Sequence, residues 1–174
     1  MDRIDELEKR LKDLEDEREL RELLTRYSFN ADLARNQEYV DLYTYDDNGS
    51  GAIDLTDMGA ERFQGPEKMM EFISTLGMLS AITGTHHAVP TMFYIDGDDA
   101  IGEGYSQTIV RTMDGPDRHG EDEPPIHPLD VQIVHANYSR WTFKRINGAW
   151  KIKERYCALL GSERAGEAII VANG

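Results

Sequence analysis

Hydrophobic positions along residues 1–36 recur at helical spacing, and the segment contains no glycine or proline, so it is predicted to be helical almost throughout. The pattern has two parts, which are separated by a charged run at 15–19. The second part begins at Leu20 and forms a broad stripe, typical of a helix that packs against a core. The first part has the alternating spacing of a coiled-coil seam. Its members are Ile4, Leu7, Leu11 and Leu14.

So short a seam is not stable as an isolated helix in water. We therefore expect residues 1–15 to be a helical arm that packs on a neighbouring subunit; the alternative is a frayed surface helix. The main domain is expected to span residues 16–160, and residues 161–174 a tail. Asp16 and Glu19 have the spacing of a capping box, which would restart the helix after the charged run.

The pattern changes to strand-like alternation in the second half of the chain. The Asn147-Gly148 pair and the run at 96–99 are hairpin turns between these strands. Pro66 opens a helix over residues 67–74, and residues 113–130 are too rich in proline, glycine and charge for a regular element. The remaining expected elements are a short helix within 37–46 and strands at 52–55, 85–95, 100–111, 132–145 and 150–159. Helices followed by consecutive hairpin strands predict an α+β fold with an antiparallel sheet.

Length and composition agree with one globular domain of 174 residues. No apolar run approaches the roughly 18 residues of a membrane helix, and the charged start does not have the pattern of a signal peptide. A single cysteine, Cys157, suits a reducing compartment, so we expect a cytoplasmic protein. The net charge of −14 argues against nucleic acid and anionic membranes as partners.

The sequence contains no glycine-rich phosphate loop, dinucleotide fingerprint or cysteine-rich metal motif, so neither a metal nor a cofactor is expected. Acid–base chemistry remains. Tyr27 and Asp32 lie on the first helix, where their directions differ by about 140°. They can converge only if the helix ends or bends near Asp32. Without such an end, Tyr27 is a core residue and Asp32 a solvated one.

Histidines on the strands are the other candidates. Alternation places His87 with Thr85 on one face and His86 on the other. On the strand at 132–145, His135 and Asn137 share a face with Trp141 and Phe143, and these large aromatic side chains predict that this face is covered. The histidine and the asparagine are therefore expected inside the protein, either as core residues or as substrate contacts.

The order of the motifs resembles that of SnoaL-like proteins, members of the nuclear-transport-factor-two-like superfamily. The resemblance rests on the opening helix at 19–32, the start of the middle helix at 65–67, the histidine strand at 84–87 and the last hairpin at 138–152. Together these cover roughly residues 16 to 160. The resemblance implies a cone-shaped α+β fold, in which a curved antiparallel sheet wraps around helices as a cystatin-like α+β barrel. It also implies a homo-oligomer, with a trimer favoured.

Within the superfamily the chain is similar to the dehydratase-like branch, which includes scytalone dehydratase, bile-acid 7α-dehydratase and hexachlorocyclohexane dehydrochlorinase. These enzymes use an aspartate–histidine pair without a cofactor. The resemblance places the pair at Asp32 and His87, with Tyr27 as a third catalytic residue.

This resemblance implies a cofactor-independent lyase acting on a small hydrophobic, cyclic or aromatic molecule, by dehydration, dehydrohalogenation or release of a small aldehyde. The expected substrate contacts are Tyr43, His135, Asn137 and Trp141. Two alternatives stay open. One is a non-catalytic binding or assembly module, like the small subunit of a ring-hydroxylating dioxygenase. The other is an isomerase or a cyclase using the same residues.

Overall fold

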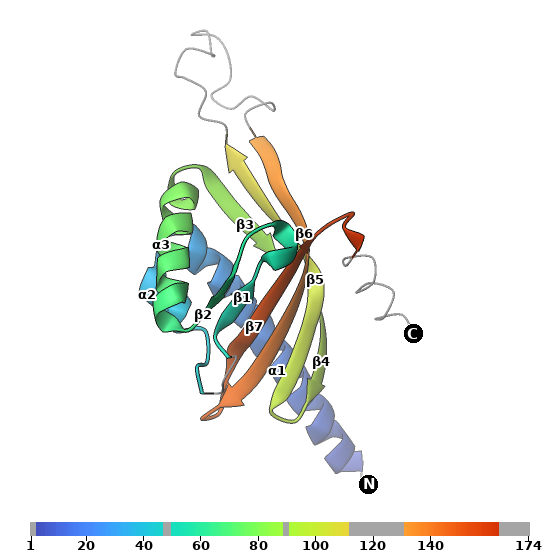
Figure 1. Cartoon of the computed structure of the whole chain (residues 1–174). Helices are drawn as coiled ribbons and strands as arrows, with labels where there is room; N and C mark the ends of the chain where they lie inside the picture. Colours follow the sequence, from blue (N-terminus) through green and yellow to red (C-terminus); the bar gives the residue numbers. More distant parts are fainter. Residues whose placement is uncertain (1–2, 47–49, 89–90, 112–130, 164–174) are drawn as a thin grey trace, which may run out of the picture.

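The computed structural model describes residues 3–46, 50–88, 91–111 and 131–163, without the side chains of 76–84, 87–88, 110–111, 131–132 and 134. One long helix crosses behind a curved sheet, two shorter helices lie beside it, and the N-terminal end of the long helix extends past the sheet (Figure 1). Residues 164–174 of the predicted tail and the irregular segment at 113–130 lie outside the described residues. No helix in the described ranges is long and apolar enough to cross a membrane.

The long helix, α1 (Arg3–Asp32), is continuous through the charged run at 15–19. The capping box predicted for Asp16 is absent, because the Asp16 carboxylate binds Lys12 on α1 and Arg145 on the sheet instead. The short helix α2 (Asn36–Val40) follows, as predicted. Helix α3 (Pro66–Thr83) begins at the predicted proline. It has 18 residues, ten more than the predicted helix at 67–74.

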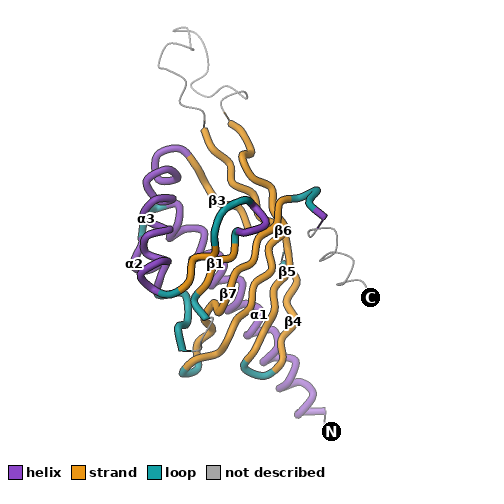
Figure 2. The backbone as a smooth tube through the Cα atoms, in the orientation of Figure 1, coloured by secondary structure: helices purple, strands orange, loops and turns teal. Residues whose placement is uncertain are grey.

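Seven strands form the sheet in the order β2-β1-β7-β6-β5-β3, with β4 also paired to β5. Neighbouring strands are antiparallel, except that β1 runs parallel to β7. The fold is therefore the predicted α+β class, a curled sheet against helices (Figure 2). The strands are β1 (Ala52–Asp54), β2 (Arg62–Gln64), β3 (Gly84–Ala88), β4 (Met92–Asp96), β5 (Asp99–Arg111), β6 (Val131–Ile146) and β7 (Ala149–Leu159).

Residues 85–95, predicted as one strand, form two strands that pair with successive parts of the same neighbour. Ala88 of β3 pairs with Ser106 of β5, and Met92 of β4 pairs with Glu103. Pro90, between them, has no N–H for a ladder hydrogen bond, which explains the interruption. Strand β2 and the single 3₁₀ turn Thr56–Met58 were not predicted, because each contains only three residues.

The hairpin between β6 and β7 confirms the Asn-Gly signal. Asn147 and Gly148 have φ values of 51° and 82°, and Ile146 pairs with Ala149 across them. Two consecutive positive φ values belong to the tight turn that matches the twist of paired strands, and asparagine followed by glycine adopts it at low cost. This turn sets the pairing of β6 with β7, the strands that carry Ser139, Trp141 and Arg155 of the candidate site.

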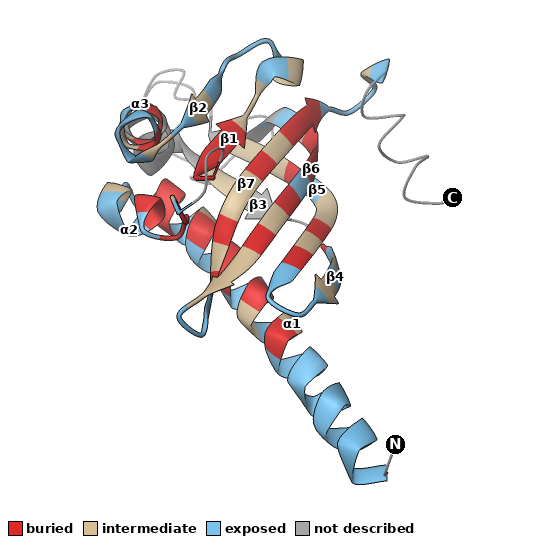
Figure 3. Cartoon of the chain, turned by 60° about the horizontal axis from the view of Figure 1, so that its bottom comes forward, coloured by how far each residue is buried: buried red, intermediate tan, exposed pale blue. Residues whose placement is uncertain are grey.

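The core lies between α1 and the inner face of the sheet. Leu20, Leu24 and Tyr27 of α1 meet Trp141 and Phe143 of β6 in one buried cluster. Figure 3 shows buried residues along the sheet and the adjoining half of α1, while the N-terminal part of α1 is exposed on every side. The aromatic face predicted on β6 is therefore covered, by the helix that carries Tyr27.

Asp16 anchors α1 to the sheet where the exposed part of the helix begins. Its side chain is 6% exposed, and it forms ion pairs with Arg145 and, at 2.9 Å, with Lys12. Burial raises the pKa of the Asp16 carboxyl, but hydrogen bonds and charge interactions with Lys12 and Arg145 outweigh burial and lower the pKa below its usual 3.8. The ionised form is therefore stabilised by folding.

Replacing Asp16 by Asn is expected to lower the free energy of unfolding at pH 7 by about 2 kcal/mol, because Arg145 loses a partly buried partner. The pKa of Asp16 is lower in the folded state, so this contribution is full above pH 4 to 5 and is lost as the pH falls through the folded value. Urea unfolding of the wild type and the variant should therefore differ at neutral pH, and the difference should shrink as the pH falls below the usual pKa of an aspartate. Asp13→Asn, on the exposed side of the same helix, is the matched control and should leave stability nearly unchanged.

Candidate functional site

Arg155 lies buried on the inner face of the sheet, 8% exposed, on β7 opposite Trp141 of β6. Its Nη1 donates a hydrogen bond to the Tyr27 hydroxyl at 2.6 Å. Its Nη2 donates to the hydroxyls of Ser106, at 2.9 Å, and Ser139, at 3.3 Å. These five residues are the Arg155 cluster, and they come from α1, β5, β6 and β7.

Aromatic rings surround the guanidinium group. Its carbon lies 4.7 Å from the Trp141 ring centroid and 5.2 Å from that of Tyr27. The Tyr39 hydroxyl donates to the Tyr27 hydroxyl at 2.7 Å, and the Tyr43 ring lies 5.8 Å from that of Tyr39. Since the Tyr27 oxygen accepts from both Tyr39 and Arg155, its own proton is available for donation to another group.

The positive charge of Arg155 has no carboxylate partner among the residues that the structure describes; all its hydrogen bonds there go to hydroxyl groups. Burial lowers the pKa of Arg155, but interactions with Cys157 and the buried tyrosines outweigh burial, so its pKa is raised and it stays charged. A buried charge without a counter-charge costs several kcal/mol (order of magnitude). Such a group is prepared for an anion, or for negative charge that develops during a reaction.

A second group of polar contacts forms where α1 ends against β3. Asp32 is the last residue of the helix, and the following Ala34 has a left-handed backbone with φ of 53°. The Asp32 carboxylate accepts hydrogen bonds from Thr85 Oγ1 at 2.8 Å and from the backbone N–H of His86 at 2.9 Å. Strand β3 is at the edge of the sheet, so half of its N–H groups have no ladder partner, and Asp32 binds one of them.

The side chain of His86 completes this arrangement. Its Nδ1 lies 2.6 Å from Asp32 Oδ1. Burial raises the pKa of Asp32, but the hydrogen bonds from His86 and Thr85 outweigh burial, so the pKa of this carboxyl is lowered overall. An ionised carboxylate only accepts hydrogen bonds, so the proton of the neutral ring stays on Nδ1, and Nε2 is left as a base.

The two groups lie on the same face of the sheet. His86 pairs with Thr108, and Ser106 of the Arg155 cluster is two residues further along β5. Residues two apart on a strand share a face and are separated by about 7 Å. A small molecule lying along β5 could therefore meet both the imidazole and the guanidinium group.

The predicted histidine partner of Asp32 is His87, whereas the observed partner is His86. The backbone of the predicted residue, His87, pairs with Gln107, and its side chain lies outside the described residues. Tyr27 and Asp32 share no hydrogen-bond partner among the described residues. Tyr27 accepts hydrogen bonds from Arg155 and Tyr39, whereas Asp32 accepts hydrogen bonds from residues of β3. The helix does end at Asp32, as their convergence would require.

Three of the predicted substrate contacts are buried near the Arg155 cluster. Trp141 and Tyr43 belong to the main core. Asn137, directly opposite Ser106, is 5% exposed, and its Oδ1 accepts no hydrogen bond from any described residue. The Nε of Arg155 is likewise buried and unpaired within the described ranges. Among the described residues, Asn137 Oδ1 is thus an acceptor without a donor, and Arg155 Nε is a donor without an acceptor.

His135 is exposed, so its predicted interior position is wrong. It shares a face with Asn137 and Trp141, but it lies further towards the end of β6, where Ile133 is also 58% exposed. The register of β5 and β6 shifts at Thr108, opposite His135. The strand therefore extends past the part of the sheet that the core covers. Alternation identifies a face but not how far along it the cover reaches.

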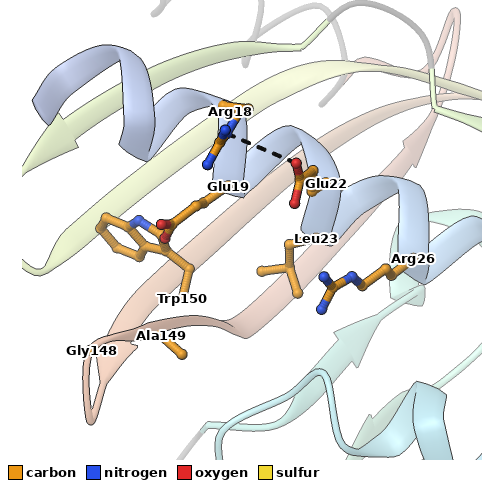
Figure 4. A pocket seen from close by; sticks show the side chains of 8 residues that line it. All are labelled: Arg18, Glu19, Glu22, Leu23, Arg26, Gly148, Ala149 and Trp150. Atoms are coloured by element: carbon orange, nitrogen blue, oxygen red, sulfur yellow. Dashed lines mark ion pairs between the residues drawn. The ribbon is translucent and has the colours of Figure 1, made fainter. Parts of the chain in front are cut away.

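A separate groove of about 330 Å³ lies between α1 and the turn of the β6–β7 hairpin (Figure 4). Half of its lining residues are charged residues of the helix, and two of these, Arg18 and Glu22, form an ion pair at 3.9 Å. Its lining residues are Arg18, Glu19, Glu22, Leu23, Arg26, Gly148, Ala149 and Trp150. None of them belongs to the Arg155 cluster or to the Asp32–His86 pair.

A curled sheet packed against one long helix is the architecture of nuclear-transport-factor-two-like proteins with a cystatin-like fold. This chain belongs to the SnoaL-like family, since residues 12–156 match the SnoaL-like domain. The family includes polyketide cyclases and dehydratases. No curated protein matches the chain.

Solved structures show the same fold. A nuclear-transport-factor-two-like protein from Novosphingobium aromaticivorans is 25% identical, with a TM-score of 0.75 over 96% of this chain and 97% of its own. A protein of unknown function from Nostoc punctiforme is 16% identical, with a TM-score of 0.62 over 84% and 92%. A Catenulispora acidiphila protein is 14% identical, with a TM-score of 0.66 over 93% and 99%.

Proposed function

We propose that this protein is a cofactor-independent lyase that removes a leaving group from a small hydrophobic, cyclic or aromatic molecule by acid–base catalysis. The observation that carries the proposal is His86 Nδ1 at 2.6 Å from Asp32, on the same sheet face as the buried Arg155, which has no carboxylate partner among the described residues. A base and a site for negative charge are the two groups that an elimination needs.

In this proposal His86, in place of His87, is the base. Its Nε2 takes a proton from the carbon next to the one that bears the leaving group. The electrons of that C–H bond form the double bond, and the leaving group departs with its own bonding pair. Asp32 stabilises the imidazolium that forms, because the carboxylate already binds Nδ1.

Tyr27 and Arg155 act on the departing atom. Tyr27 gives its proton to a leaving oxygen, so that water is released, and Arg155 stabilises the charge left on the phenol oxygen. The proton on His86 then returns to Tyr27 through solvent, which restores both residues. A halide would leave as the anion beside Arg155. For aldehyde release the base takes a hydroxyl proton, and the electrons of that O–H bond form the carbonyl of the aldehyde. The carbon–carbon bond breaks, and its electron pair stays on the other carbon, which takes the proton of Tyr27.

The rings of Tyr27, Tyr39, Tyr43 and Trp141 favour a cyclic or aromatic substrate, since they supply flat apolar surface around the charged groups. Asn137 Oδ1, which accepts no hydrogen bond from a described residue, would accept one from a substrate hydroxyl. The same set of residues could also move a proton within a substrate, so the type of product separates a lyase from an isomerase or a cyclase.

A panel of aromatic and alicyclic alcohols, halides and aryl-propanediols would test the proposal. Compounds that raise the thermal midpoint are incubated with the protein, and the products are weighed by mass spectrometry. We expect a product lighter than its substrate by water, hydrogen halide or formaldehyde. Conversion at unchanged mass would instead establish an isomerase or a cyclase, and ligands that bind but remain unchanged would establish a binding module. Heat-denatured protein is the control for spontaneous loss.

A further inference from the structure

The N-terminal part of α1 carries a row of large apolar side chains in contact with solvent. Ile4 is 61% exposed, Leu7 54%, Leu11 58% and Leu14 65%. Single exposed leucines are common, but four in register on one helix form a continuous apolar stripe. We name these four residues the α1 seam.

The α1 seam lies on the opposite side of the helix from the face that packs on the sheet. With about 100° per residue, the seam is centred roughly half a turn away from Leu20, Leu24 and Tyr27, which are buried. The seam also lies in the part of the helix that extends beyond the sheet (Figure 3). The seam and the buried face lie on opposite sides of one straight helix, so they cannot both pack against the same core. The described residues of this chain therefore leave the α1 seam exposed.

Charged residues beside the seam specify how a partner helix would lie. In heptad positions, Ile4 and Leu11 are a, and Leu7 and Leu14 are d. The flanking g positions are then both basic, Arg3 and Arg10, and the flanking e positions are both acidic, Glu8 and Glu15. All four of these charged residues are exposed.

In a parallel, in-register coiled coil each g residue faces the e residue five places later on the neighbouring helix. For two copies of this helix, Arg3 would face Glu8 of the partner subunit, and Arg10 would face Glu15 of the partner subunit. An antiparallel pair would place g against g and e against e, so that like charges would face each other. The charge pattern is thus complementary to itself in the parallel arrangement alone.

We propose that the α1 seam packs, parallel and in register, against the same seam of another copy of this chain. The apolar residues supply the association, and the flanking arginine–glutamate pairs set the direction and register. The arm is short, and two heptads alone are marginal in water, so the coil forms as part of an assembly of whole chains. The arrangement suits any cyclic oligomer with its axis along the arms.

The test is a pair of neighbouring charge reversals in the full-length protein, Arg10→Glu at a g position and Lys9→Glu at the outer f position. Both remove a positive charge and add a negative one. Arg10→Glu is expected to weaken association about tenfold, because attractive contacts with glutamate become repulsive, while Lys9→Glu has little effect. Dissociation constants come from sedimentation equilibrium at low salt. Circular dichroism checks that both variants keep their fold.

Complementary variants test the direction. Arg3→Glu with Arg10→Glu gives an all-acidic arm, and Glu8→Lys with Glu15→Lys gives an all-basic arm. Each should self-associate weakly, and a mixture of the two should form a mixed oligomer. A monomeric wild type, equal effects of Arg10→Glu and Lys9→Glu, or tighter self-association of the acidic-arm variant would each overturn the proposal.

Discussion

Replacing His86 by Gln is expected to lower kcat by about 10²- to 10⁴-fold, the usual contribution of a positioned general base. Glutamine keeps a polar side chain of similar size at the edge of the sheet, and Asp32 keeps its hydrogen bonds to Thr85 and to the backbone of residue 86. The loss would therefore report the imidazole. The measurement is single-turnover kinetics with the substrate found by mass spectrometry, so that product release does not mask the chemical step.

His87→Gln is the matched comparison, because it makes the same chemical change one residue away. Sequence resemblance assigns the base to His87, whereas the contact with Asp32 favours His86. We expect His87→Gln to retain most of the activity. A loss confined to the His87 variant would return the role of base to that residue, and an unchanged kcat in both variants would remove histidine from the mechanism.

Replacing Arg155 by Met is expected to lower kcat by about 10²- to 10³-fold, as for the loss of a group that stabilises developing charge. The same change should leave the thermal midpoint unchanged or raise it. Burying a charge without a carboxylate partner opposes folding, and an apolar side chain of similar length removes that cost. Residues that lower the stability of the fold but are needed for activity are typical of functional sites.

Arg155→Lys separates charge from geometry. Lysine keeps the positive charge but cannot bind Tyr27, Ser106 and Ser139 from one planar group, so it should recover only part of the lost activity. A large drop in the thermal midpoint of Arg155→Met, together with full activity in the protein that remains folded, would show that the arginine is a structural residue. Thermal unfolding and kinetics on the same preparations distinguish the two cases.

Most of the fold could be predicted from sequence because local patterns and tertiary structure agree there. The Asn147-Gly148 turn needs two positive φ values, which these two residues adopt readily, so the longest hairpin is specified locally. Pro66 marks the start of α3 for a similar reason. The division of residues 85–95 into two strands was missed, because alternation continues in both parts and only the pairing with β5 shows two strands.

The candidate site was predicted only in part. Asp32, Tyr27, Asn137 and Trp141 lie at or beside the two groups of contacts, but Arg155 and His86 were not chosen as functional residues. By strict alternation Arg155 lies on the opposite face from Trp150 and Ile152. The register shift opposite Thr142 leaves Lys153 as an extra residue, so that Arg155 follows Ile152 onto the inner face.

The sequence by itself thus determined the class of fold, the order of the main elements and the exposed seam of the first helix. These features depend on periodicity and turn chemistry, which act over a few residues. The tertiary structure decided which histidine meets Asp32 and that His135 lies beyond the covered part of the sheet. It also decided that Arg155, which has no carboxylate partner among the described residues, enters the core. Each of these depends on strand register and helix docking, which join residues distant in the chain and leave no local pattern.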